Sequence, residues 1–151
     1  MITEVEVKTI PAQPMAAVRG ETTMHEISKT IRRLFDQYYA KPAPPPRGLN
    51  VVYYHADGEP DQFERGEAMP IECGTLMASS ASPGVTGMLP AGRVVCVAYY
   101  GPYSGMSEPH NALVEYTKQH GLKRAGPFWE VYGHHNDDPA KLRIDVFHLL
   151  K

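Results

Sequence analysis

Apolar and polar residues recur along this chain with the two periods that distinguish strands from helices. Residues 4–10 alternate between charged and apolar side chains, as in a strand with one buried face. Apolar residues recur at spacings of three and four over residues 22–39, which predicts a helix, and a second helix is predicted over residues 105–120. Residues 93–100 are apolar nearly throughout and predict a central strand. Further strands are predicted at 15–19, 49–55, 71–78, 128–134 and 142–149.

Capping residues and prolines predict where the helices begin and end. Thr22 or Thr23, with Glu26 three residues after Thr23, predicts a capping box at the start of the first helix. Gly121 is a natural end for the second helix. Four prolines between residues 42 and 46 predict a stiff, extended linker after the first helix, because proline cannot continue a helix.

The order of the predicted elements suggests an internal repeat. It reads β-α-β-β followed by a second β-α-β-β. Residues 51–55 align with residues 130–134, with matching hydrophobicity and a shared Tyr and His, and this alignment makes Val51 the counterpart of Glu130. One repeat therefore carries a charge where the other is apolar.

We expect an α+β fold built from this duplicated unit. A single domain is predicted over residues 1–151, with one pseudo-repeat at about 1–80 and the other at about 88–151. The strands are expected to combine into one antiparallel sheet with both helices on one face. A ligand cleft is expected where the two repeats meet.

Composition and charge narrow the class of protein. The 151 residues contain 15 Lys and Arg against 17 Asp and Glu, a formal net charge of −2, so the broad positive field that favours direct nucleic-acid binding is not expected. Cys73 and Cys96 lie in apolar surroundings and are expected to be buried thiols. The chain has no signal-peptide pattern and no apolar run of about 20 residues, so we expect a cytoplasmic protein without a membrane partner.

Glu130 is the first candidate for chemistry. Strand alternation places Phe128, Glu130 and Tyr132 on one face and Trp129 on the other. A carboxylate between two aromatic rings is costly to bury unless it is paired or protonated, so it is expected to hold a cation or to act in acid–base chemistry. The alternative is a salt bridge to a Lys or Arg of a neighbouring strand.

Tyrosines and histidines are the next candidates. Nine tyrosines include Tyr53 and Tyr100, which lie in predicted strands, and such rings suit a pocket for flat, aromatic or cationic molecules. The seven histidines suggest a metal, but His134 and His135 point to opposite faces of a strand and no metal-binding spacing occurs. Neither a metal site nor a cofactor is expected.

Three segments carry a resemblance to a known family. Residues 89–93 (LPAGR), 101–103 (GPY) and 126–132 (GPFWEVY), with the elements between them, resemble the GyrI-like small-molecule-binding family, which includes effector-binding domains of multidrug-responsive and AraC-type regulators. The resemblance implies a concave pocket with a buried glutamate at Glu130 and an aromatic residue of the last strand at Phe147, where relatives often have Tyr. Some stand-alone relatives hydrolyse reactive cyclopropane-bearing compounds.

Three hypotheses on function follow from this resemblance and from the residues. The first is a protein that binds aromatic or lipophilic, cationic small molecules for sensing or sequestration. The second is a hydrolase of reactive hydrophobic compounds that uses Glu130 as its catalytic residue in the same pocket. The third is an interaction protein that inhibits a partner such as DNA gyrase. The predicted ligand-binding residues are Glu130, Tyr132, Phe128, Trp129, Tyr53, Tyr100 and Phe147.

Overall fold

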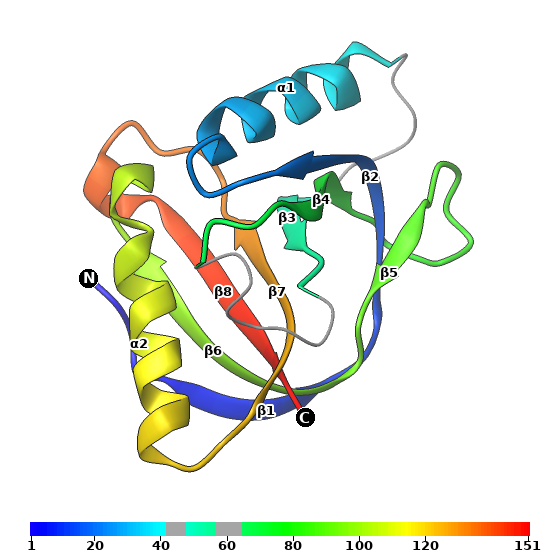
Figure 1. Ribbon diagram of the computed structural model, residues 1–151. Helices are drawn as coiled ribbons and strands as arrows, with labels where there is room; N and C mark the ends of the chain where they lie inside the picture. The colour runs from blue at the N-terminus through cyan, green and yellow to red at the C-terminus, as the bar shows by residue number, and fades with distance from the viewer. Residues whose placement is uncertain (42–47, 57–64) are drawn as a thin grey trace.

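The computed structural model describes residues 1–41, 48–56 and 65–151 and shows a sheet with two helices (Figure 1). The predicted proline linker at 42–46 lies outside the described residues. The helices are α1 (Ile27–Ala40) and α2 (Ser107–Gln119), with short 3₁₀ turns η1 (Tyr103–Gly105) and η2 (Pro139–Lys141). The strands are β1 (Glu6–Ile10), β2 (Gln13–Thr22), β3 (Asn50–Tyr54), β4 (Met69–Leu76), β5 (Gly87–Leu89), β6 (Gly92–Tyr100), β7 (Arg124–Tyr132) and β8 (Arg143–Leu150).

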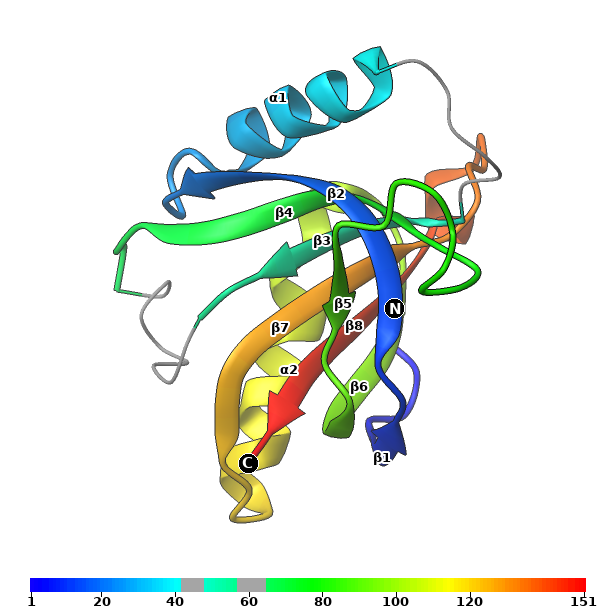
Figure 2. The same cartoon turned by 90° about the vertical axis from the view of Figure 1, so that its right-hand side faces the viewer.

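All eight strands form one curled antiparallel sheet. Their order across the sheet is β1-β6-β8-β7-β3-β4-β2-β5, and every pairing is antiparallel. The sheet curves strongly, as Figure 2 shows. One apolar cluster on its inner face contains Met15 of β2, Leu89 of β5 and Val94 of β6, although these strands belong to opposite ends of the sheet. Curling therefore lets the two ends bury apolar surface against each other.

Both helices pack on the other face of the sheet. Leu34 of α1 shares a cluster with Val52, and Leu113 of α2 shares a cluster with Val146. Val52, Glu130 and Val146 are directly paired across β3, β7 and β8, so their side chains share a face. The prediction of an α+β fold with an antiparallel sheet and two helices on one face is confirmed.

The structure corrects some of the predicted details. The first helix begins at Ile27 rather than near residue 22, because Thr22 ends β2 and its hydroxyl donates to the hydroxyl of Thr30. Glu26 occupies the N-cap position and makes no side-chain capping bond, so the predicted capping box is wrong. The apolar strand β6 lies second from an edge rather than at the centre, with β1 and β8 as its neighbours. The short strand β5 was not predicted.

The strand order has the symmetry that two related units would produce. Reading outward from the middle, β3-β4-β2 on one side corresponds to β7-β8-β6 on the other. The residue alignment is nevertheless wrong, because Val51 lies in the inner cluster while Glu130 lies on the helix face. Val52, which pairs with Glu130, shares its face. The duplication itself stays a prediction.

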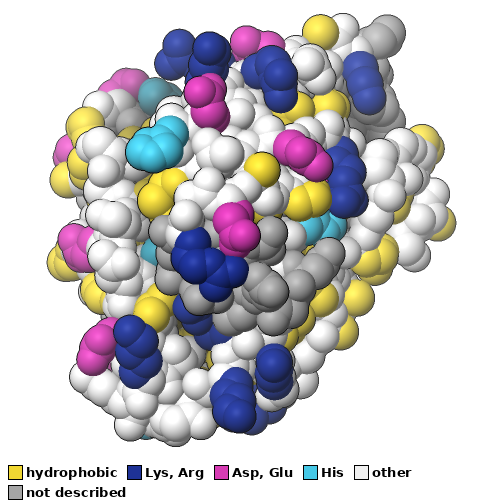
Figure 3. Space-filling view, in the orientation of Figure 1, with side chains coloured by type: hydrophobic (Ala, Val, Ile, Leu, Met, Phe, Trp, Pro, Cys, Tyr) yellow, Lys and Arg dark blue, Asp and Glu magenta, His cyan; other side chains and the backbone are white. Residues whose placement is uncertain are grey.

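The surface of the protein carries charges of both signs. Basic and acidic side chains are interspersed on the face seen in Figure 3, in keeping with the net charge of −2. No helix among the described residues is long and apolar enough to cross a membrane. Cys73 and Cys96 are both buried, as predicted.

Candidate ligand-binding site

A cavity of about 1010 Å³ opens on the helix-bearing face of the sheet. Side chains of both helices and of strands β3, β7 and β8 line it. Its apolar walls include Ile27, Ile31 and Phe35 of α1 and Val114 of α2. A volume of this size can hold a drug-sized molecule of several rings.

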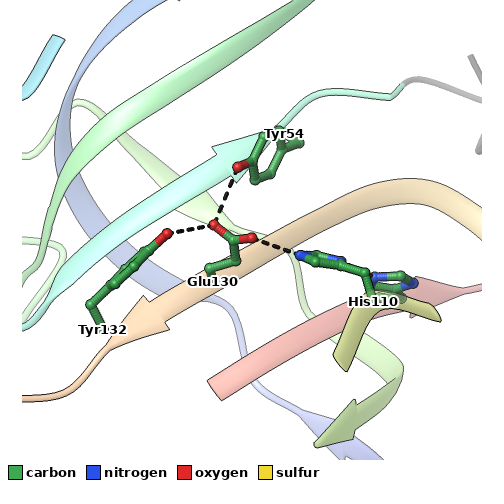
Figure 4. A network of polar contacts seen from close by, with 5 residues as sticks. Tyr54, His110, Glu130 and Tyr132 are labelled. Atoms are coloured by element: carbon green, nitrogen blue, oxygen red, sulfur yellow. Dashed lines mark hydrogen bonds and ion pairs between the residues drawn. The ribbon is translucent and has the colours of Figure 1, made fainter. Parts of the chain in front are cut away.

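Glu130 of β7 is the buried acid of this cavity. It is 3% exposed and accepts hydrogen bonds from the hydroxyls of Tyr132 (2.8 Å) and Tyr54 (3.2 Å) at the same oxygen, Oε1 (Figure 4). Its other oxygen, Oε2, lies 2.6 Å from Nε2 of His110. Three polar groups from three elements therefore compensate the loss of water around this carboxylate.

His110 of α2 links Glu130 to a second, more deeply buried histidine. Its Nδ1 lies 2.9 Å from Nε2 of His148 of β8. His148 is 3% exposed, and its Nδ1 has no hydrogen-bond partner among the described residues. Burial and the neighbouring His110 and Arg124 hold the pKa of His148 well below its usual range, so this ring is neutral at pH 7.

Aromatic rings surround the carboxylate. Tyr54 and Phe128 stack with their ring centroids 4.4 Å apart, and Tyr103 meets Tyr132 edge to face at 5.6 Å. Tyr103, 52% exposed, belongs to the turn before α2 and lines the cavity at the solvent side. Burial and the charge of Glu130 raise the pKa of Tyr54 and of Tyr132, so both hydroxyls keep their protons and donate.

The structure separates the predicted site residues into two groups. Phe128, Glu130 and Tyr132 line the cavity together, on the face that strand alternation predicted for them. Trp129 and Tyr53 lie in the cluster on the opposite face.

Phe147 and Tyr100 also lie away from the cavity lining. Phe147 packs on the inner cluster and stacks on Trp129 at 5.6 Å. Tyr100 lies where β6 ends and accepts a hydrogen bond from Arg143 at 3.1 Å. The sheet therefore lies between the cavity and the side chains of Trp129, Tyr53 and Phe147, and Tyr100 does not line the cavity.

The sequence-based prediction of the site missed two histidines: His110, which contacts Glu130, and His148, which contacts His110. His110 falls in the apolar stripe of the second predicted helix, and His148 falls at a buried position of the alternation Ile144, Val146, His148. Each histidine is a polar residue at a position that the pattern assigns to the core, and this was the signal in the sequence that could have identified it as a site residue. The alternative pairing of Glu130 with a Lys or Arg is wrong for the described residues, because His110 takes that place.

The Glu130–His110–His148 group does not form a metal site. Within the part of the chain that the structure describes, no three or more His, Cys, Asp or Glu side chains are arranged to hold a metal ion. The rings of His110 and His148 instead bond to each other. The arrangement suits recognition of a ligand by charge and aromatic contact, with an imidazole beside the carboxylate.

Comparison with known families agrees with this geometry. The model of the GyrI-like small molecule binding domain matches residues 3–151. The chain belongs to this family. As a GyrI-like domain it binds small molecules, and the cavity over Glu130 is the candidate place for the ligand. Among curated proteins none matches the chain.

Solved structures share the GyrI-like fold over nearly the whole chain. The C-terminal domain of EcmrR is 18% identical, with 98% of this chain and 97% of that chain covered and a TM-score of 0.69. In the EcmrR–DNA complex the match spans 57% of the EcmrR chain. SAV2435 bound to tetraphenylphosphonium is 13% identical, with 99% of this chain and 94% of that chain covered and a TM-score of 0.67. A hydrolase from Listeria innocua is 11% identical, with 98% of this chain and 92% of that chain covered and a TM-score of 0.60. At these identities the likeness shows the fold.

Proposed function

We propose that this GyrI-like domain binds aromatic or lipophilic monocations in the cavity over Glu130. The observation that carries the proposal is a buried carboxylate in the wall of a large cavity whose remaining walls are largely aromatic and apolar. A delocalised cation would gain Coulomb attraction from Glu130 and cation–π contact from Tyr54, Phe128 and Tyr132.

The hydrogen bonds of Glu130 narrow the class of cation further. Its two oxygens already accept from two tyrosine hydroxyls and contact His110. About one acceptor position is left on these oxygens, so the three N–H groups of a primary ammonium could not all be satisfied there, whereas a phosphonium or quaternary ammonium ion has no N–H to satisfy. Arg32, which is exposed, and Arg124, which is half-buried, also line the cavity. Water screens the repulsion between these arginines and a bound cation more than it screens the attraction between the cation and the buried Glu130.

The neighbour SAV2435 supports the choice of probe. Its structure contains tetraphenylphosphonium, a rigid aromatic monocation without a titratable group. We expect this ion to bind the present protein in the micromolar range, about −8 kcal/mol, as measured by isothermal titration calorimetry. No detectable binding at millimolar probe would reject the proposal.

A matched pair of variants tests the role of the carboxylate. Glu130→Gln keeps the shape and removes the charge, and is expected to weaken tetraphenylphosphonium by about 2 kcal/mol or more. Glu72→Gln is the control, because Glu72 is also largely buried beside a histidine but does not line the cavity. Equal affinity in wild type and Glu130→Gln would place the cation elsewhere.

A second candidate function is hydrolysis in the same cavity. It is favoured by the contact of Glu130 with both an imidazole and a phenol, which together can move protons. Incubation with a cyclopropane-bearing electrophile and with simple esters, followed by mass spectrometry, tests it. We expect stoichiometric binding without product, because Trp129 lies on the opposite face and cannot assist Glu130. Multiple turnovers that Glu130→Gln abolishes would favour the hydrolase.

A further inference from the structure

The two histidines beside Glu130 form a continuous hydrogen-bonded chain with it. Glu130 Oε2 lies 2.6 Å from His110 Nε2, and His110 Nδ1 lies 2.9 Å from His148 Nε2. Glu130 and His148 are each 3% exposed, and the side chain of His110 is 22% exposed. All three line the cavity. The mechanism of cation recognition described above uses the carboxylate and leaves the histidine pair without a role.

The hydrogen-bonded chain of Glu130, His110 and His148 has a first protonation state in which both imidazole rings are neutral. An ionised Glu130 only accepts, so His110 carries its proton on Nε2. Its Nδ1 is then an acceptor, and His148 must donate from Nε2. His148 Nδ1 is left as a bare nitrogen, which agrees with its lack of a partner among the described residues. The charge of the three groups together is −1.

A second state holds one more proton and keeps every hydrogen bond. His110 now carries protons on both nitrogens and donates to Glu130 and to His148 Nε2. His148 stays neutral with its proton on Nδ1. The positive charge therefore lies on His110, the ring in contact with the carboxylate. Glu130 and His110 form an ion pair, and the charge of the three groups together is zero.

We propose that His110, supported by His148, is a specificity-determining residue that sets the charge that the cavity presents to its ligand. This inference rests on the proposed function and couples the binding of the ligand to the protonation of His110. With both rings neutral, the cavity favours a lipophilic monocation. With His110 protonated, the ion pair cancels the charge of Glu130, and the cavity favours neutral aromatic molecules of the same shape. Binding of a cation then releases a proton.

The groups around His110 allow its charge to dominate the response. Among the described residues that line the cavity, Glu130 is the one carboxylate, and it contacts His110 directly. His135 also lines the cavity but is exposed and pairs with Asp137 at 3.0 Å. On α2 itself, Glu108 and Lys118 do not line the cavity. The other titratable or charged side chains that face the cavity are Arg32 of α1, Tyr54 of β3, Tyr103 of η1, Arg124 and Tyr132 of β7 and His148 of β8.

Tetraphenylphosphonium and a neutral analogue, triphenylphosphine oxide, test this coupling. Calorimetric titrations between pH 5 and pH 8 are expected to show the affinity for the cation falling as the pH falls. The slope is at most about tenfold per pH unit, because one proton is exchanged per cation bound. Repeating the titration in buffers of different ionisation enthalpy should reveal the released proton directly. The affinity for triphenylphosphine oxide should change less than about twofold.

Three variants separate the histidine pair from other histidines. His110→Gln keeps an amide N–H near Glu130 but cannot take up a proton, so the affinity for the cation should become independent of pH. His135→Gln should keep the wild-type pH profile. His120→Gln is the matched control on the same helix, since His120 is exposed and does not line the cavity. Circular dichroism checks that each variant is folded.

The outcomes distinguish this inference from the proposed function. Absence of tetraphenylphosphonium binding at every pH overturns the proposed function. Binding whose affinity does not change with pH, with no proton released, overturns the role of His110 and leaves the proposed function standing. A pH profile that persists in His110→Gln or disappears in His135→Gln also overturns it. If His110→Gln does not fold, the proton release of the wild-type protein and the ¹⁵N shifts of its histidine rings still decide between the two charge states.

Discussion

Two carboxylate–imidazole pairs occupy opposite faces of the same sheet. Glu130 meets His110 on the helix-bearing face, and Glu72 meets His55 on the inner face, each at 2.6 Å. Both pairs are largely shielded from water. Glu72 shares its face with Tyr53, its directly paired neighbour across β3 and β4, and Tyr53 belongs to the inner apolar cluster.

The surroundings of the two pairs differ much more than the pairs themselves. On the inner face, Tyr53 stacks on His55 at 4.2 Å and shares a buried apolar cluster with Trp129. On the helix face, Glu130 borders a cavity of about 1010 Å³. A carboxylate–imidazole pair shielded from water is therefore not sufficient for a ligand site, and the adjoining space distinguishes the two faces. Four predictions test this difference, in order of their expected effect on stability.

Truncating the largest ring of the inner face should cost the most. Trp129 is 1% exposed, and Trp129→Ala is expected to lower the free energy of unfolding by about 3–5 kcal/mol, because it leaves a void in a filled core. Phe128→Ala on the cavity face should cost less and should weaken tetraphenylphosphonium. Urea unfolding and calorimetry measure both effects. Equal stability losses in the two variants would contradict the distinction between a filled and an open face.

Removing each carboxylate compares the two pairs directly. Glu130→Ala deprives the hydroxyls of Tyr54 and Tyr132 and the imidazole of His110 of their acceptor, and should cost about 2–3 kcal/mol. Glu72→Ala should cost about 1 kcal/mol, since among the described side chains it deprives His55 alone of its partner, where Glu130→Ala deprives three groups. Thermal unfolding at pH 7 gives the two values. A larger loss for Glu72→Ala would show that the inner pair is the more tightly coupled one.

Acid should reveal the buried histidine of the cavity face. An unfolded histidine has a pKa of about 6.5, while burial keeps the pKa of folded His148 well below it. Between these two pKa values, residue 148 is protonated in the unfolded chain but stays neutral in the folded protein. The free energy of unfolding therefore falls as the pH drops below about 7, by up to about 1.4 kcal/mol per pH unit. Urea unfolding of wild type and His148→Gln at pH 7, 6 and 5 measures this. Parallel pH profiles would assign the acid sensitivity to other groups.

The smallest effect is expected at Tyr100, outside both regions. Tyr100→Phe removes a hydrogen bond to Arg143, whose side chain is largely exposed, and should change stability by at most about 0.5 kcal/mol. It should leave the affinity for tetraphenylphosphonium unchanged, because Tyr100 does not line the cavity. A tenfold loss of affinity in calorimetry would return Tyr100 to the site.

Local periodicity was sufficient to predict both helices, every strand but the short β5, and one wall of the site. Alternation along residues 128–132 placed Phe128, Glu130 and Tyr132 together and Trp129 behind them, since successive side chains of a strand point to opposite faces. The alignment that made Val51 the counterpart of Glu130 was wrong by one position. In a strand one position is enough to move a side chain to the other face.

The partners of Glu130 were decided by the tertiary structure. Tyr54 reaches it through the antiparallel register of β3 with β7, and His110 reaches it because α2 packs across β6 and β8. These contacts join residues 76 and 20 positions away in the chain, and no local pattern encodes such distances. The sequence alone determined that a carboxylate would be buried among aromatic rings. Which face remained open, and which imidazole would lie beside that carboxylate, depended on the curl of the sheet and on the placement of the two helices, because these bring distant segments together.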